Sequence, residues 1–118
     1  MCGIAGLVFH DRDPGLVSRG AGLIRKMTGA LRHRGPDDEG YLAVESGTGK
    51  ATELWGSESA LKRGADIDDF RGPADLLLGH RRLAVLDPSP AGHQPMPYAG
   101  GRYWVVYNGE IFNWPDLG

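Results

Sequence analysis

The apolar positions near the start of the chain change from a continuous run to a helical spacing. The run over residues 2–10 predicts a buried strand. Its apolar members are Ile4, Leu7, Val8 and Phe9. From residue 16 to residue 31 the apolar positions lie instead on one face of a helix. Within this segment Gly20 and Gly22 each weaken a helix by about 1 kcal/mol relative to alanine, so we expect one strand followed by one helix with a weak first half.

Further along the chain, short apolar runs alternate with turn-forming segments. Four runs predict strands, at residues 41–44, 52–55, 76–86 and 102–113. The first two flank the turn ESGTGK and would form a hairpin, whereas the third has a polar centre, GHRR. We expect residues 58–73 to be an exposed loop, and residues 87–101, with four prolines and three glycines, to lack regular structure. One early helix among several strands predicts a sheet-rich fold with both element types, not a helical bundle.

Length and charge narrow the class of protein. A chain of 118 residues forms at most one small domain. Thirteen basic and fifteen acidic residues give a formal charge of -2 without a basic run, which argues against nucleic-acid partners. No apolar stretch is long enough to cross a membrane and no signal peptide is evident, so we expect a cytoplasmic protein. The single cysteine excludes an internal disulfide, and no Cys/His spacing indicates a metal site.

That single cysteine, Cys2, directly follows the initiator methionine. If Met1 is removed, one residue carries both a thiol nucleophile and an α-amino group whose reference pKa of about 7.7–8.0 suits it to accept the thiol proton. The other reading, a buried or incidental cysteine, is the commoner fate of free cysteines. Position alone leaves both readings open.

The stretch YNGEIFN carries a second candidate group. Asn108 and Gly109 could supply a side-chain amide and a backbone N–H to an oxyanion, and Glu110 adds a carboxylate for a substrate amine or amide. An ordinary Asn-Gly turn explains the same residues.

In GHRRLAVLD two adjacent arginines follow a strand. Because strand side chains alternate, Arg81 and Arg82 cannot point the same way, and one of them could hold a substrate carboxylate. A pair of surface arginines is the alternative. We interpret His80 as a hydrogen-bonded structural residue, and His10 and His93 show no partner in the sequence and receive no role.

The motifs MCGIAG, RHRGPD, GHRRLAVLD, HQPM and YNGEIFN, taken in this order, resemble the glutaminase domain of glutamine-hydrolysing asparagine synthetases. This is the N-terminal-nucleophile (Ntn), class II glutamine amidotransferase family. The resemblance covers nearly the whole chain except residues 45–75. RHRGPD and NGEIFN favour the asparagine synthetase branch over the glucosamine-6-phosphate synthase and phosphoribosylpyrophosphate amidotransferase branches. RHRGPD receives no catalytic step, since basic residues at a helix end explain it equally well.

The resemblance implies a role for each matching position. Cys2 would attack the side-chain amide of L-glutamine, forming a thioester and releasing ammonia, with Asn108 and Gly109 as the oxyanion hole. Arg82 would pair with the glutamine α-carboxylate. The residues implied to line the glutamine pocket are Arg82, Leu83, Ala84, Val85, Leu86, Asn108, Gly109 and Glu110.

The resemblance also implies an α+β fold, an Ntn-type four-layer αββα sandwich that is incomplete at its C-terminal side over residues 1–118. The family's aspartate for the glutamine α-amino group lies in a motif that these residues do not contain. We therefore expect a truncated domain, inactive by itself. No cofactor is implied for it; ATP and Mg²⁺ are implied for a missing synthetase domain of the same parent chain, which would amidate aspartate. A homodimer of the full-length parent stays open.

Two other functions remain open at this point. One is an asparagine-synthetase-like amidotransferase with another carboxylate as acceptor. The other is an inactive fragment that persists as a binding remnant. The intact set of Cys2, Arg82, Asn108, Gly109 and Glu110 favours a catalytic parent.

Overall fold

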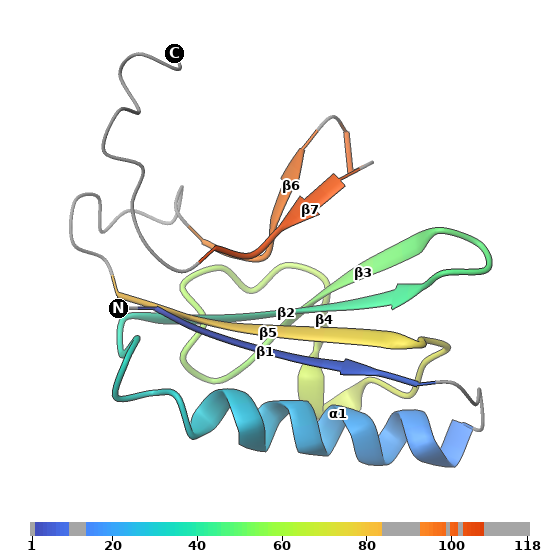
Figure 1. Ribbon diagram of the computed structural model, residues 1–118, viewed down its shortest axis with the longest axis horizontal. Helices are drawn as coiled ribbons and strands as arrows, with labels where there is room; N and C mark the ends of the chain where they lie inside the picture. The colour runs from blue at the N-terminus through green and yellow to red at the C-terminus, as the bar shows by residue number, and fades with distance from the viewer. Residues whose placement is uncertain (1, 10–13, 84–92, 99, 102, 108–118) are drawn as a thin grey trace.

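A five-stranded sheet carries one helix on one face and a two-stranded sheet on the other (Figure 1). The computed structural model describes residues 2–9, 14–83, 93–98, 100–101 and 103–107, with only the backbone for residues 14–18. Its elements are β1 (Gly3–Val8), α1 (Pro14–Gly29), β2 (Asp38–Glu45), β3 (Lys50–Trp55), β4 (Ala65–Asp66), the 3₁₀ turn η1 (Ile67–Asp69), β5 (Leu76–Arg82), β6 (Met96–Tyr98) and β7 (Tyr103–Val105).

The order of strands in the large sheet is β1-β5-β2-β3-β4. All neighbouring pairs are antiparallel except β3 with β4. The segment at the start of the chain therefore lies against a strand more than seventy residues later, with Gly3 opposite Arg81. This pairing brings the first motif of the sequence beside the third.

The hydrophobic core lies between α1 and the sheet. Ile24 of the helix and Leu77 of β5 are completely buried there. The helix packs closely because Gly79 has no side chain, and a Cβ at that position would overlap the hydroxyl of Thr28. Apolar burial on this face is the main force that holds the helix to the sheet.

The predicted helix and first strand are confirmed, but part of their predicted burial is wrong. In β1, Ile4 is 40% and Val8 68% exposed, because successive side chains of a strand point to opposite faces and only one face packs on α1. In α1, Leu23 is 49% exposed, whereas Ile24 beside it is buried. The apolar run therefore contains more residues than the core takes up.

The predicted hairpin is confirmed as β2 and β3, with β2 beginning three residues earlier than expected, at Asp38. The predicted strand over residues 76–86 is confirmed from Leu76 to Arg82, and residues 84–86 lie outside the described residues. Of the last strand, predicted over residues 102–113, only Tyr103–Val105 is confirmed, as β7. Residues 106–107 are not part of a strand, and the Asn-Gly turn lies outside the described residues.

Two segments expected without regular structure contain short elements. Residues 58–73 include β4 and η1, because Ile67, only 1% exposed, anchors the segment in the core. Residues 87–101 include β6, which pairs antiparallel with β7. Both predictions failed because these elements are stabilised by partners distant in the sequence.

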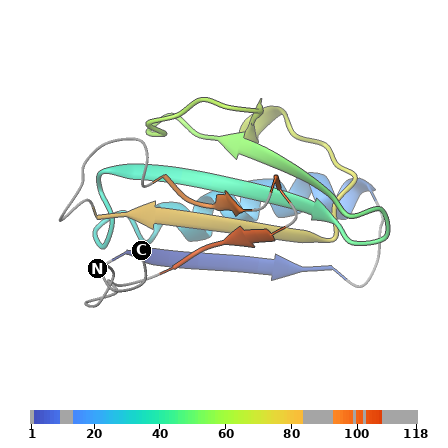
Figure 2. The ribbon, with the colours of Figure 1, turned by 90° about the horizontal axis from the view of Figure 1, so that it is seen from above.

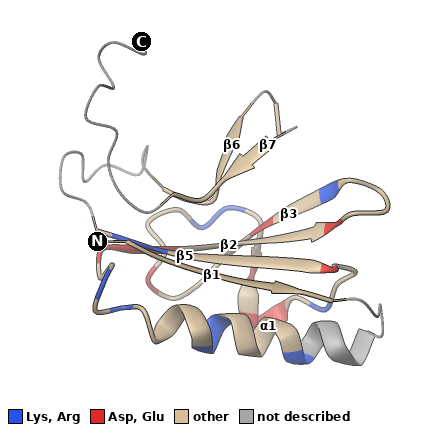
Figure 3. Cartoon of the chain, in the orientation of Figure 1, with Lys and Arg blue, Asp and Glu red and all other residues tan. Residues whose placement is uncertain are grey.

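The described residues thus form three layers in space: the helix, the large sheet and the two-stranded sheet (Figure 2). This is an α+β arrangement. The charged residues of α1 are all basic, whereas the large sheet and its loops carry both Lys or Arg and Asp or Glu (Figure 3). Within the described ranges no helix is both long and apolar enough to span a membrane.

Candidate functional site

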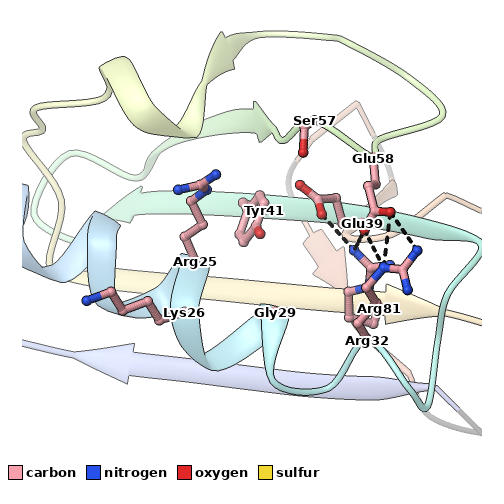
Figure 4. A pocket seen from close by; sticks show the side chains of 9 residues that line it. All are labelled: Arg25, Lys26, Gly29, Arg32, Glu39, Tyr41, Ser57, Glu58 and Arg81. Carbon is pink, nitrogen blue, oxygen red and sulfur yellow. Dashed lines mark hydrogen bonds and ion pairs between the residues drawn. The ribbon is translucent and has the colours of Figure 1, made fainter.

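The two arginines at the end of β5 occupy opposite faces of the sheet. Arg81 points to the helix side and is 1% exposed; its Nε donates to the carbonyl oxygen of Gly35 at 2.7 Å and its Nη1 to Glu39 at 2.6 Å. Glu58 approaches the same Nη1 at 3.1 Å (Figure 4). Both carboxylates balance the buried guanidinium, so Arg81 is a structural residue.

A pocket of about 200 Å³ opens on this helix side. Its lining is Arg25, Lys26, Gly29, Arg32, Glu39, Tyr41, Ser57, Glu58 and Arg81 (Figure 4). Burial raises the pKa of Glu39, and the neighbouring Arg81 opposes that rise. Burial also raises the pKa of Tyr41. Three of the four cations here, Arg25, Arg32 and Arg81, are engaged by carboxylates.

These contacts give RHRGPD a structural explanation. Arg32 binds Glu58 through two guanidinium nitrogens, at 2.9 Å for each nitrogen's closer contact, and the hydrogen bond from Arg32 lowers the pKa of Glu58. A Cβ on Gly35 would overlap the backbone of Arg81. The motif is therefore held against the end of β5 from behind, on the face opposite Arg82.

The other face of the sheet carries Cys2 and Arg82. Cys2 precedes Gly3, which faces Leu31 just beyond α1, and Arg82 alternates with Arg81. Cys2 is half-buried, and its Sγ accepts a hydrogen bond from the backbone N–H of Leu83 at 3.4 Å. Arg82 is 8% exposed. The structure thus brings together the thiol, the second arginine and the start of LAVLD from motifs 80 residues apart.

His80, on the same face as Arg82, has the structural role that the sequence predicted. Its Nε2 donates to the backbone carbonyl of Tyr107 at 3.0 Å, which fixes the proton on Nε2. Burial lowers the pKa of His80 despite this bond. The ring is therefore neutral near pH 7.

His93, which received no role from the sequence, is part of a buried pair. Its Nδ1 lies 2.6 Å from Asp38 Oδ2, with side chains 5% and 3% exposed. The second oxygen, Asp38 Oδ1, accepts from the N–H of Ala60 at 2.7 Å. The only signal for His93 in the sequence was its place in the HQPM motif, since its partner Asp38 lies 55 residues away.

The remaining residues predicted for the site lie outside the described residues. They are Ala84, Val85, Leu86, Asn108, Gly109 and Glu110. The described residues contain no group of three His, Cys, Asp or Glu side chains able to hold a metal ion.

Comparison with known proteins identifies the class. Residues 49–118 match the family model described as a glutamine amidotransferase domain. The chain belongs to this family.

The chain is similar to named proteins of two kinds. The chain is 32% identical, over 99% of its length, to an asparagine synthetase (glutamine-hydrolysing) of Methanocaldococcus jannaschii, and 30% identical, over 99%, to one of Bacillus subtilis. It is 31% identical, also over 99%, to a glutamine–fructose-6-phosphate aminotransferase (isomerizing) of Staphylococcus aureus. The chain covers 20%, 14% and 18% of these proteins, respectively. No solved structure matched.

Proposed function

We propose that this chain is the glutaminase part of a glutamine-dependent asparagine synthetase. The observation that carries the proposal is the placement of Cys2 beside Leu83 and Arg82 on the sheet face that looks toward β6 and β7. A thiol nucleophile and a guanidinium suited to a substrate carboxylate then share one face of the sheet.

In the proposed reaction, removal of Met1 frees the α-amino group of Cys2, which takes the thiol proton. The sulfur then attacks the side-chain amide carbon of L-glutamine, and the C–N bond breaks as the nitrogen receives the proton and leaves as ammonia. Water hydrolyses the thioester to glutamate and restores the thiol. The N–H of Leu83 fixes the orientation of the sulfur before attack.

The other groups follow from the same proposal. Arg82 binds the glutamine α-carboxylate with its guanidinium fork. Asn108 and Gly109 stabilise the oxyanion, and the segment from Leu83 to Leu86 together with Glu110 lines the pocket. The two facing sheets are the central layers of a four-layer αββα sandwich. A synthetase domain of the same protein, with ATP and Mg²⁺, passes the ammonia to aspartate.

One comparison supports a second candidate acceptor for the ammonia, fructose 6-phosphate. The Staphylococcus aureus aminotransferase is as similar to the chain as the asparagine synthetases are. To distinguish the two acceptors, the full-length protein is given glutamine labelled at its amide nitrogen, with either aspartate and ATP or fructose 6-phosphate. Only the true acceptor takes up the labelled nitrogen.

The test of the nucleophile is Cys2→Ala in the full-length protein that carries this chain. We expect glutamine hydrolysis to disappear while synthesis from free ammonia continues, because the acceptor chemistry does not use the thiol. Release of glutamate from glutamine and formation of the amide product are measured side by side. Glutaminase activity that survives in Cys2→Ala contradicts the assignment.

A further inference from the structure

A ring of contacts joins the second sheet to the first around one residue, Tyr107. Tyr107 is the last described residue before Asn108, and both polar groups of its backbone are engaged by side chains. Its N–H donates to Gln94 Oε1 at 2.6 Å, and its carbonyl accepts from His80 Nε2 at 3.0 Å. That carbonyl belongs to the peptide linking Tyr107 to Asn108.

Each of the two residues is itself held against the large sheet. His80 lies on β5, is 1% exposed and is paired in register with Gly40 of β2. Gln94 follows His93, which is held by the buried Asp38 at the start of β2. The backbone of Gln94 crosses directly over β2, where a Cβ on Gly40 would overlap the Gln94 carbonyl oxygen.

These contacts close a circuit. It runs from Gly40 to Gln94, on to Tyr107, back to His80 and across the strand pair to Gly40. Gln94 holds the peptide group before Tyr107 through its N–H, and His80 holds the peptide group after Tyr107 through its carbonyl oxygen. Rotation of either peptide group breaks one of these hydrogen bonds, so the backbone on both sides of Tyr107 is fixed. The rigid element behind both bonds is the sheet that also carries Cys2.

We propose that His80 and Gln94 are positioning residues that fix the backbone on both sides of Tyr107, directly before the oxyanion pair, Asn108 and Gly109. The inference rests on the proposed function, which assigns that pair. Preorganised donors stabilise a developing oxyanion only when their geometry is set before reaction, and a displacement of about 1 Å costs on the order of 10²-fold in rate. His80 and Gln94 contact no reacting atom and act through the backbone of Tyr107.

The test uses paired variants of the full-length protein. His80→Ala and Gln94→Ala each remove one bond to Tyr107, whereas His80→Gln keeps an N–H donor and Gln94→Glu keeps an oxygen acceptor. For glutamine hydrolysis we expect both alanine variants to lower kcat by about 10- to 100-fold with KM within about threefold, and both conservative variants to restore most of kcat.

Ser59→Ala is the matched control. Its buried hydroxyl donates to the backbone carbonyl oxygen of Glu39 and accepts from the N–H of Gly56, away from Tyr107. This variant loses hydrogen bonds of similar burial, so it should lower thermal stability and leave kcat unchanged. Amide hydrogen exchange of the peptide covering residues 103–110 is measured on the same samples, and only His80→Ala and Gln94→Ala should accelerate it.

The outcomes separate the two claims. An active wild-type protein whose alanine variants keep kcat within twofold overturns the positioning role alone, as does a loss that tracks melting temperature in all variants including Ser59→Ala. A wild-type protein that leaves glutamine intact overturns the proposed function, and the positioning role with it. Loss of kcat restored by the conservative variants supports both.

Discussion

Arg81 and Arg82 are adjacent in the sequence and have different tasks in the structure. Strand alternation sends Arg81 toward Glu39 and Glu58 behind the sheet and Arg82 to the face of Cys2. Strand alternation in the sequence predicted that only one of the two arginines could hold a substrate carboxylate. It did not show which one, since the partners of Arg81 lie 42 and 23 residues away. Substituting the two residues one at a time should therefore give opposite kinds of defect.

Arg82→Ala should raise the KM for glutamine by about 10- to 100-fold with a smaller change in kcat, because a charge-assisted bond to the substrate carboxylate is worth about 1.5–3 kcal/mol. Arg81→Met should instead destabilise the fold by about 3–5 kcal/mol, since it leaves the buried Glu39 without its cation. Steady-state kinetics and denaturant unfolding are run on both variants. A raised KM in a stable Arg81→Met protein would reverse the assignment.

Within α1, two glycines that look equivalent in the sequence have different surroundings. A Cβ on Gly20 would overlap the ring of Phe9, which follows β1, whereas a Cβ on Gly22 meets nothing within 4 Å. The helix needs one of these glycines to approach the end of the first strand and gains nothing from the other. Propensity alone assigned both the same cost.

We expect Gly22→Ala to stabilise the protein by about 0.5–1 kcal/mol through a less flexible unfolded chain. Gly20→Ala should destabilise it by about 1–3 kcal/mol, since the phenyl ring has to move out of a packed position. Denaturant midpoints of the two variants, measured together, check the difference in sign. Equal shifts would show that the contact with Phe9 does not limit helix packing.

At the level of elements, the local sequence pattern predicted the helix and strands whose formation depends on neighbouring residues in the chain. The apolar runs and the ESGTGK turn located β1, α1, β2, β3 and β5. They missed β6, because three residues with a central proline carry no strand signal and pairing with β7 supplies the stabilisation. In the same way His93 showed no role, because Asp38 comes within reach only when the second sheet folds over the first. The order of the motifs therefore indicated which residues form the site, whereas the contacts between them became visible only in the folded structure.

Across the whole molecule, the layers determine how acid acts on stability. His80 is enclosed between the large sheet and the segment that includes Tyr107, and burial lowers its pKa below the reference value of about 6.5. The Tyr107 carbonyl and Asp38 oppose this shift, whereas His93 and Arg82 add to it. Between the folded pKa and 6.5 the unfolded chain binds more protons than the native state. The free energy of unfolding therefore falls as pH drops through that window and levels off below it.

His80→Gln removes this titration and keeps the N–H donor to Tyr107. We expect the wild-type protein to lose stability relative to His80→Gln as pH falls from 7 to 5, with a slope of at most about 1.4 kcal/mol per pH unit. Denaturant unfolding of the two proteins at half-unit pH steps measures the difference. Parallel profiles for wild type and His80→Gln would mean that the two sheets do not enclose His80 tightly enough to exclude its proton.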